Sequence, residues 1–268
     1  MVIRIIKRFF KERFFDQAAQ NAYYLLLSVL PFLLVVLSIV QFLPVEEASI
    51  LALLRPFVPD ESFTLLEQSV QSMLYKSHGK LLVLSVLAAL WTSSVAVQSF
   101  ARSLDLANQK IHRQPVWVSL IRTLGVTVLF MLVVPLSLFL PLIERLLRTV
   151  IAYYDVLEAW EGWLYVWPNI KWGLGTFFLF IFFLIFYQLV PTGKMKWKQA
   201  LPGALLSAFG WQLVSLLFGD YVSRVDYSRL YGQLAGIIML VLWFYLTAVI
   251  IIFSGLLNAE WKRRVRSR

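Results

Sequence analysis

The sequence contains no cysteine and only two histidines, His78 and His112, among its 268 residues. Without cysteine, disulfide bonds and thiolate metal sites are excluded. Two isolated histidines also leave a zinc site almost no ligands beyond carboxylates. We therefore expect neither a metal ion nor another cofactor in this protein.

Charged residues are scarce as well. They make up 15% of the chain, against 60% hydrophobic residues, whereas they form about a quarter of a soluble globular domain. This composition is typical of an integral membrane protein.

The N-terminal segment interleaves basic and apolar residues, so we expect no cleaved signal peptide. On a helix its apolar residues would share one side, flanked by cations. This pattern predicts a helix lying in the membrane interface over anionic lipid headgroups, or one that serves only as a topology anchor. The apolar residues are Val2, Ile5, Ile6, Phe9, Phe10 and Phe14, and the flanking cations are Arg4, Lys7, Arg8 and Lys11.

Six windows of 18 or more residues are apolar and free of charge, which is long enough for a helix to cross a bilayer. They lack the two-residue alternation of barrel strands. The sequence therefore predicts an all-α polytopic membrane protein, with six transmembrane helices in a single domain over residues 1–268. The expected spans are 22–43, 81–101, 123–143, 172–193, 199–219 and 230–259.

Lysine and arginine are distributed unevenly over the segments that flank these spans. Seventeen lie in the two terminal segments and in alternate connections, and eight lie in the other three connections. Because positive residues favour the cytoplasmic side, we expect both termini to be cytoplasmic. Topology then accounts for the net charge of +10, and no nucleic-acid partner is needed.

Polar residues recur at three- and four-residue steps near the first expected span: Gln17, Asn21, Tyr24 and Ser28. A polar seam of this kind faces protein or water rather than lipid. The second span ends in Arg102 and Asp105, close to the expected cytoplasmic mouth. Small polar residues at such spacing also act as simple packing contacts between helices.

The expected sixth span has a charged head at its outer end. Asp220 and Arg224, and likewise Asp226 and Arg229, are close enough along a helix to pair. The head is either a polar vestibule or a short solvated loop. Below it, the GxxxG spacing from Gly232 to Gly236 predicts a close approach between helices.

The rest of the sixth span carries a semi-polar face that includes Trp243 and Asn258, and Glu260 is a lone acid before the basic tail. Small residues on two sides of the fifth span place it in the middle of the bundle. Residues 177–187 of the fourth span are almost all large aliphatic or aromatic, so we expect them to form a lipid-facing wall.

Several motifs resemble those of the YihY/BrkB family of bacterial inner-membrane proteins, in the same order over essentially the whole chain. They are Ala18-Ala19, Ala22-Tyr23-Tyr24, Leu27-Ser28, Pro31, Pro191, Lys198, Pro202-Gly203-Ala204, Phe218, Tyr221, Tyr231-Gly232, Trp243-Phe244-Tyr245, Gly255 and Asn258-Ala259-Glu260. The resemblance implies a bacterial cytoplasmic membrane and a loose association with the envelope and with transport.

Members of that family were once labelled ribonuclease BN. Metal-dependent cleavage of RNA needs clustered carboxylates or histidines, and the expected cytoplasmic face offers only a few scattered ones. The sequence also has no phosphate-binding glycine loop and no GxSxG motif. We therefore expect that the protein is not an enzyme.

Our leading hypothesis is a transporter or flippase for a lipid or amphipathic envelope component. Its pathway would run between the first, second, fifth and sixth spans, with membrane lipids and anionic headgroups as partners. The alternative is a non-transporting scaffold or envelope-assembly factor, and a homo-oligomer is compatible with either. The pathway residues would be Gln17, Asn21, Tyr24, Ser28, Arg102, Asp105, Asp220, Arg224, Asp226, Arg229, Trp243, Asn258 and Glu260.

Overall fold

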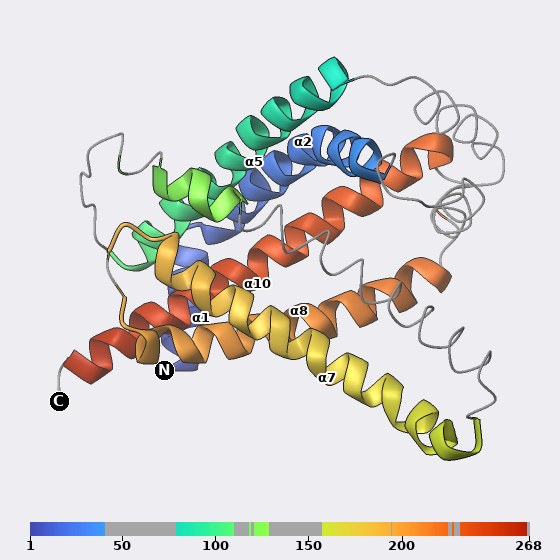
Figure 1. Ribbon diagram of the computed structural model, residues 1–268. Coiled ribbons are helices and arrows are strands. Elements are labelled where there is room, and N and C mark those ends of the chain that lie inside the picture. Colours follow the sequence, from blue (N-terminus) through green and yellow to red (C-terminus); the bar gives the residue numbers. More distant parts are fainter. Residues whose placement is uncertain are drawn as a thin grey trace. The chain divides into compact units, whose positions relative to one another are not determined.

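The regular structure of the described chain is entirely helical (Figure 1). The computed structural model describes residues 1–40, 79–109, 118, 121–128, 157–193, 195–224, 227 and 231–266. Residues 121–128 form a helical stretch within these ranges. The main elements are α1 (Val2–Lys11), α2 (Phe14–Val40), α5 (Gly79–Ala107), α7 (Leu157–Leu189), α8 (Trp197–Arg224), the 3₁₀ helix η2 (Gly232–Leu234) and α10 (Ala235–Arg266).

Five helices in the described ranges are long and apolar enough to cross a membrane. They match five of the six expected spans, which confirms the prediction of an all-helical, multi-pass membrane protein. The third expected span, at 123–143, lies outside the described residues beyond position 128. The candidate spans are Phe14–Val35, Val83–Ala107, Trp172–Leu189, Trp197–Arg224 and Ala235–Val265.

Several helices extend beyond the uncharged windows. α2 begins at Phe14 and α10 continues to Arg266, because a helix can run on into the polar region where charged side chains are well solvated. α7 also covers residues 157–171, which the sequence had assigned to a connection. At its other end α7 stops at Leu189, since Pro191 has no backbone N–H and disfavours helical geometry at the preceding residue.

The chain divides into two compact units, one of Met1–Leu26 with Ser94–Arg268 and the other of Leu27–Ser93. The first unit holds α1, α7, α8 and α10 with the start of α2 and the end of α5. The second holds the remaining parts of α2 and α5. Each contact discussed below lies inside the first unit.

In the first unit, α8 packs against both α7 and α10. Its small side chains are buried and allow this close approach: Ala200, Gly203, Ala204, Ser207 and Ala208. A Cβ atom on Gly203 would lie 2.5 Å from the carbonyl oxygen of Ser254 in α10, so no larger residue fits there. The predicted close approach of neighbouring helices on two sides of this helix is confirmed for α7 and α10.

The close approach predicted at the GxxxG motif is wrong. A Cβ atom on Gly232 or on Gly236 would meet no atom of the described residues within 4 Å. Gly232 instead starts the 3₁₀ helix with a φ of +53°, a left-handed value that suits glycine. The 3₁₀ turn has three residues per turn, so the two glycines do not form one α-helical face.

The lipid-facing wall predicted for residues 177–187 is correct only at its start. Phe177 and Phe178 are exposed, whereas Phe183, Phe186 and Tyr187 are buried in the core of the first unit. Hydropathy could not separate these positions, because large aromatic residues suit both lipid and a packed protein interior.

A buried charge cluster at the chain termini

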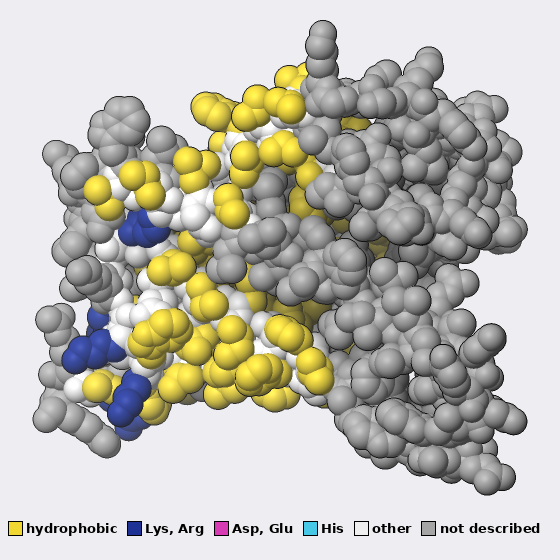
Figure 2. Space-filling view, in the orientation of Figure 1, with side chains coloured by type: hydrophobic (Ala, Val, Ile, Leu, Met, Phe, Trp, Pro, Cys, Tyr) yellow, Lys and Arg dark blue, Asp and Glu magenta, His cyan; other side chains and the backbone are white. Residues whose placement is uncertain are grey.

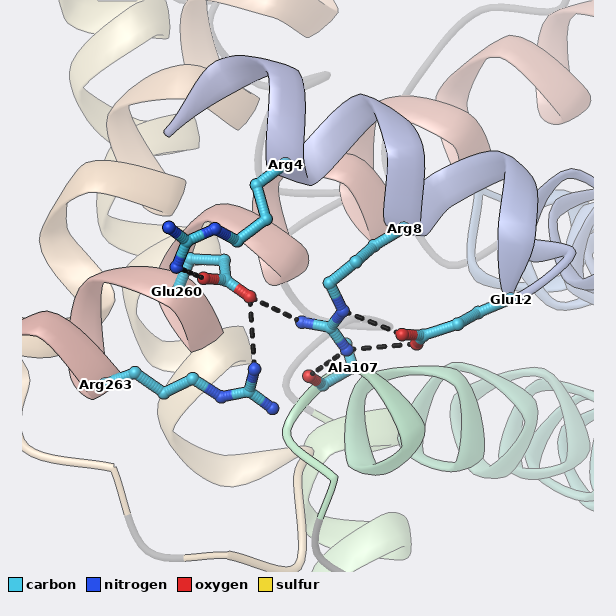
Figure 3. A network of polar contacts seen from close by, with 6 residues as sticks. All are labelled: Arg4, Arg8, Glu12, Ala107, Glu260 and Arg263. Carbon is cyan, nitrogen blue, oxygen red and sulfur yellow. Dashed lines mark hydrogen bonds and ion pairs between the residues drawn. The ribbon is translucent and has the colours of Figure 1, made fainter.

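The two ends of the chain meet in a cluster of charged side chains (Figure 3). It consists of Arg4, Arg8 and Glu12 from α1, and Glu260 and Arg263 from α10, and we call it the terminal cluster. Only 10% of the Arg8 side chain and 4% of the Glu260 side chain are exposed. The cluster is therefore largely shielded from water at its centre.

Arg8 joins three helices through one guanidinium group. Its Nη1 donates to Oε1 of Glu260 over 3.0 Å. Its Nε and Nη2 donate to the two carboxylate oxygens of Glu12 at 2.8 and 3.0 Å, and Nη2 also donates to the carbonyl oxygen of Ala107 at 3.1 Å. That carbonyl belongs to the last residue of α5, so α1, α5 and α10 are tied together at one point.

Two more arginines approach Glu260. Arg263 Nη1 lies 3.2 Å from Oε1, and Arg4 Nη1 lies 3.6 Å from Oε2. With three arginines and two glutamates the cluster carries a net charge of +1. Its outer arginines are much more exposed than Arg8.

The pKa of Arg8 reflects two opposing effects. Burial lowers it, but the hydrogen bonds and negative charges of Glu12 and Glu260 outweigh burial and raise the pKa above the ordinary value. Arg8 consequently stays charged at any physiological pH.

Local packing explains why Arg8 points inward. Ile5 and Phe9 are buried, and Phe9 packs against Phe253 of α10 with ring centroids 6.0 Å apart. Positions 5, 8 and 9 share a face of a helix, so the side that buries Ile5 and Phe9 also carries Arg8 inside. The sequence analysis had placed Arg8 among the flanking cations. The spacing to Ile5 and to Glu12 was the signal that could have set it apart.

Further polar contacts join α10 to its neighbours. The Asn258 Oδ1 atom accepts a hydrogen bond from the Gly203 amide over 2.7 Å. The Tyr187 hydroxyl donates to the carbonyl oxygen of Ile251 at 2.7 Å and lies 2.6 Å from the Ser207 hydroxyl. Sequence reasoning missed Tyr187, which lies at the end of the aromatic run.

Asp105 and Arg122 hold the connection between α7 and α8. The Asp105 carboxylate accepts the backbone N–H of Thr192 at 2.7 Å. Arg122 donates to the carbonyl oxygen of Pro191 at 3.2 Å. The end of α5 thereby contacts the end of α7.

Asn21 is the buried member of the polar seam on α2. Its Nδ2 donates to the carbonyl oxygen of Gln17 at 2.7 Å and to the Ser103 hydroxyl at 3.1 Å. Asn21, Asp105, Asn258 and Glu260 thus each contact another helix or a connection.

For the remaining predicted pathway residues, the structure gives local contacts or exposure. Trp243 packs edge-on against Trp211, with ring centroids 5.7 Å apart. Arg102 is exposed, Tyr24 is half-buried, and Ser28 belongs to the second unit. Asp220 and Arg224 form an exposed pair 2.8 Å apart, as their spacing predicted. Asp226 and Arg229 lie outside the described residues.

Several buried polar atoms within the candidate spans have no hydrogen-bond partner among the described residues. They include Oδ1 of Asn21, Oγ of Ser215, Oγ1 of Thr247 and Nδ2 of Asn258. Leaving a buried donor or acceptor unsatisfied costs roughly 1–3 kcal/mol. Among the same residues, no three acidic or histidine side chains are grouped so as to hold a metal ion.

A comparison with known protein families identifies the family of this chain. Residues 5–268 match the family model described as virulence factor BrkB. The chain belongs to the BrkB family. This confirms the resemblance inferred from the sequence motifs.

Relatives in this family are named as membrane proteins or as ribonuclease-like. The chain is 31% identical over 250 residues to YfkH of Bacillus subtilis, whose name calls it ribonuclease-like, covering 93% of this chain and 90% of that protein. It is 25% identical over 264 residues to a UPF0761 membrane protein of Xanthomonas campestris, covering 95% of this chain and 59% of the relative. A UPF0761 membrane protein of Xanthomonas oryzae is likewise 25% identical, with 59% of its length covered. No solved structure matches the chain.

Proposed function

We propose that this BrkB-family protein is a transporter or flippase for a lipid or another amphipathic envelope component. It would work in the bacterial cytoplasmic membrane, with the terminal cluster closing the cytoplasmic end of the pathway. The observation that carries the proposal is the burial of Arg8 and Glu260 where the polar pathway would open.

A buried ion pair is a weak way to hold helices together permanently. Removing its charges from water costs several kcal/mol per ion, and well-packed apolar residues often stabilise as much or more. Charged side chains are well hydrated once an ion pair opens, whereas exposing apolar side chains to water costs free energy. A contact made of Arg8 and Glu260 therefore suits a closure that opens and closes again.

The unpartnered polar atoms give independent support. Asn21, Ser215, Thr247 and Asn258 each keep one buried polar atom without a partner inside a candidate span. Polar groups inside a membrane are expensive and usually serve a pathway or a site. A rearranged bundle, or the polar part of a substrate, would satisfy them.

The contacts in the first unit also support the expected topology. Both chain ends lie at the terminal cluster, and Asp105 in α5 contacts Thr192 just after α7. The end of α5 and the end of α7 would then lie on the same side of the membrane. Because α7 itself brings the chain back to that side, the segment between α5 and α7 would cross the membrane an odd number of times. We therefore retain six spans with both termini cytoplasmic, where lysine and arginine are concentrated.

A non-transporting scaffold is the second candidate, and a specific observation favours it. Asn258 bonds to Gly203, and Tyr187 bonds to Ile251 and Ser207, so several polar groups already serve as links between helices. In this alternative the partner of the protein would be another envelope component, assembled on its surface.

We further propose that the protein is not an enzyme, despite the ribonuclease-like name of YfkH. RNA cleavage with a metal needs several acidic or histidine ligands around one ion. The acidic residues of the terminal cluster are already neutralised by arginines. Purified protein supplied with Mg²⁺, Mn²⁺ or Zn²⁺ should leave structured and single-stranded RNA intact, and cleavage that copurifies with the protein would overturn this view.

Lipid movement in reconstituted vesicles tests transport directly. A fluorescent anionic lipid is placed in both leaflets, and an impermeant quencher reports how much reaches the outer leaflet with time. Vesicles with the protein should show faster movement than empty vesicles, under at least one proton or sodium gradient. If no anionic lipid moves under any gradient, transport fails and the scaffold remains.

Charge reversal at the outer end separates the two candidates. Arg224→Glu combined with Arg229→Glu should abolish movement in a transporter that still folds, because guanidinium groups suit anionic headgroups. Arg13→Glu is the matched control, since Arg13 is equally exposed and also pairs locally, with Asp16. Retained movement with loss of partner binding would favour the scaffold.

A further inference from the structure

Two arginines of the terminal cluster have spare hydrogen-bonding capacity. Arg8 uses its guanidinium on Glu12, Glu260 and the Ala107 carbonyl. Arg4 and Arg263 each make a single contact, with Glu260, among the described residues. Their side chains are 74% and 42% exposed, so a ligand from outside can reach both guanidinium groups.

The two arginines come from opposite ends of the chain but meet at one carboxylate (Figure 3). Glu260 neutralises only one of the three arginines around it, and Glu12 neutralises a second. The net charge of +1 therefore lies on the exposed side of the cluster. A guanidinium group presents paired donors that match the oxygen atoms of a phosphate.

Exposed apolar side chains occur on the same two helices as the arginines. On α1, Ile3 is 82% exposed, and on α10 Trp261 and Val265 are exposed, two positions before and after Arg263 in the sequence. Tryptophan beside basic residues is typical of the level of lipid headgroups. Figure 2 shows lysine and arginine gathered at the end of the molecule where the termini lie, beside a largely hydrophobic surface.

We propose that Arg4 and Arg263 form a binding site for the phosphate of one anionic phospholipid, with Glu260 holding the two arginines in place. A lipid is the favoured source of the phosphate, because Arg263 lies at the end of a candidate membrane span, at the level where lipid headgroups begin. The site does not depend on transport. If the site proposal is wrong, the purified protein will not prefer the anionic lipid. If the transport proposal is wrong, this preference will remain while lipid movement between leaflets is absent.

Lipid retention by the purified full chain tests the site. The protein is held in an uncharged detergent, so that no anionic surface is present, and is given phosphatidylglycerol or phosphatidylcholine with identical acyl chains. Native mass spectrometry then counts bound lipids. We expect one phosphatidylglycerol to be retained about tenfold more strongly than phosphatidylcholine, a ratio typical of one charge-assisted contact. Equal retention of the two lipids would overturn the proposal.

Matched double variants locate the site. Arg4→Gln with Arg263→Gln should remove the preference for phosphatidylglycerol, while the Arg8–Glu260 pair remains to hold α1. Lys7→Gln with Lys11→Gln removes the same number of charges outside the cluster and should keep the preference. Equal losses in both would mean a general charge effect and would refute the site. If the first double variant does not fold, Arg263→Gln alone should still weaken the preference, and an unchanged preference would refute the site.

Inorganic phosphate distinguishes a lipid from a free anion. If phosphate at millimolar concentration displaces phosphatidylglycerol, the site takes free phosphate and the lipid assignment is wrong. We expect no displacement, since a free anion lacks the acyl chains that would insert into the detergent micelle beside the span.

Discussion

Two arginine–carboxylate pairs in the first unit have similar distances but differ in burial and in the sequence separation of their partners. Arg8 lies 3.0 Å from Glu260, and Arg224 lies 2.8 Å from Asp220. The first pair is buried and joins residues 252 positions apart, whereas the second is exposed and spans one helical turn. A short distance therefore says little about how much an ion pair contributes to stability. Its burial and the part of the fold that it joins decide this.

The two pairs also depend differently on the fold. Asp220 and Arg224 can pair on any helix that covers both positions, because residues four apart are neighbours. Arg8 and Glu260 meet only when α1 rests on α10, with Phe9 against Phe253. The buried pair thus reports on the assembled unit, and the exposed pair reports only on α8.

The largest expected effect comes from Glu260→Gln. This change leaves three arginines around a neutral group and should lower the free energy of unfolding by about 3 kcal/mol, the range for breaking a buried pair. Unfolding of the purified protein in one detergent measures it. An effect as small as that of a surface mutation would show that the cluster is solvated. The buried and exposed pairs would then contribute equally to stability, against our account.

The second largest effect is expected for a substitution in the close contact between α8 and α10. Gly203→Ala places a methyl group against the Ser254 carbonyl oxygen and the Asn258 side chain, and overpacking of this kind costs about 1–3 kcal/mol. Gly219→Ala, also on α8, is the matched control because a Cβ there meets nothing within 4 Å. Equal stability of both variants would contradict the close approach of α8 and α10.

A smaller effect is expected for Tyr187→Phe. It removes the hydroxyl that contacts Ile251 and Ser207 while keeping the ring, so the free energy of unfolding should fall by about 1 kcal/mol. Tyr23→Phe is the control, because Tyr23 is exposed. If the two variants are equally stable, the buried hydroxyl does not help to hold α7, α8 and α10 together.

The smallest effect is expected for Asp220→Asn. Exposed ion pairs contribute at most about 1 kcal/mol, and salt screens them. The midpoint of unfolding should hardly change, and raising the salt concentration should erase any difference. A loss comparable to that of Glu260→Gln would mean that the pair of Asp220 and Arg224 is buried by another part of the assembly.

Helix positions were largely predictable because long uncharged windows leave few alternatives in a membrane. The pair of Asp220 and Arg224 was predictable for the same reason, since it depends only on spacing along one helix. The partner of Glu260 was not, because no local pattern connects residue 8 to residue 260. The glycines differ in the same way: the small-residue rows of the fifth span, which include Gly203, correctly predicted a close contact, whereas GxxxG spacing singled out Gly232 and Gly236, which make none with the described residues.

The site residues divide in the same way. Asn21, Asp105, Asn258 and Glu260 were identified as polar and unusual within or beside a span, and all four make specific contacts. Their use was harder to foresee, because a polar side chain in a membrane helix can line a pathway or bind a neighbouring helix with the same sequence pattern. Burial and partners had to come from the structure.

The distance between α1 and the end of α10 tests the role of the terminal cluster most directly. Because the chain has no cysteine, Ile3→Cys and Val265→Cys can be spin-labelled specifically at two exposed positions. Pulsed electron resonance on the reconstituted protein should give one narrow distance distribution. Adding Glu260→Gln should produce a second, longer component, whereas adding Asp220→Asn should not. A distribution that is broad from the start, or unchanged by Glu260→Gln, would contradict the claim that the buried pair holds α1 on α10.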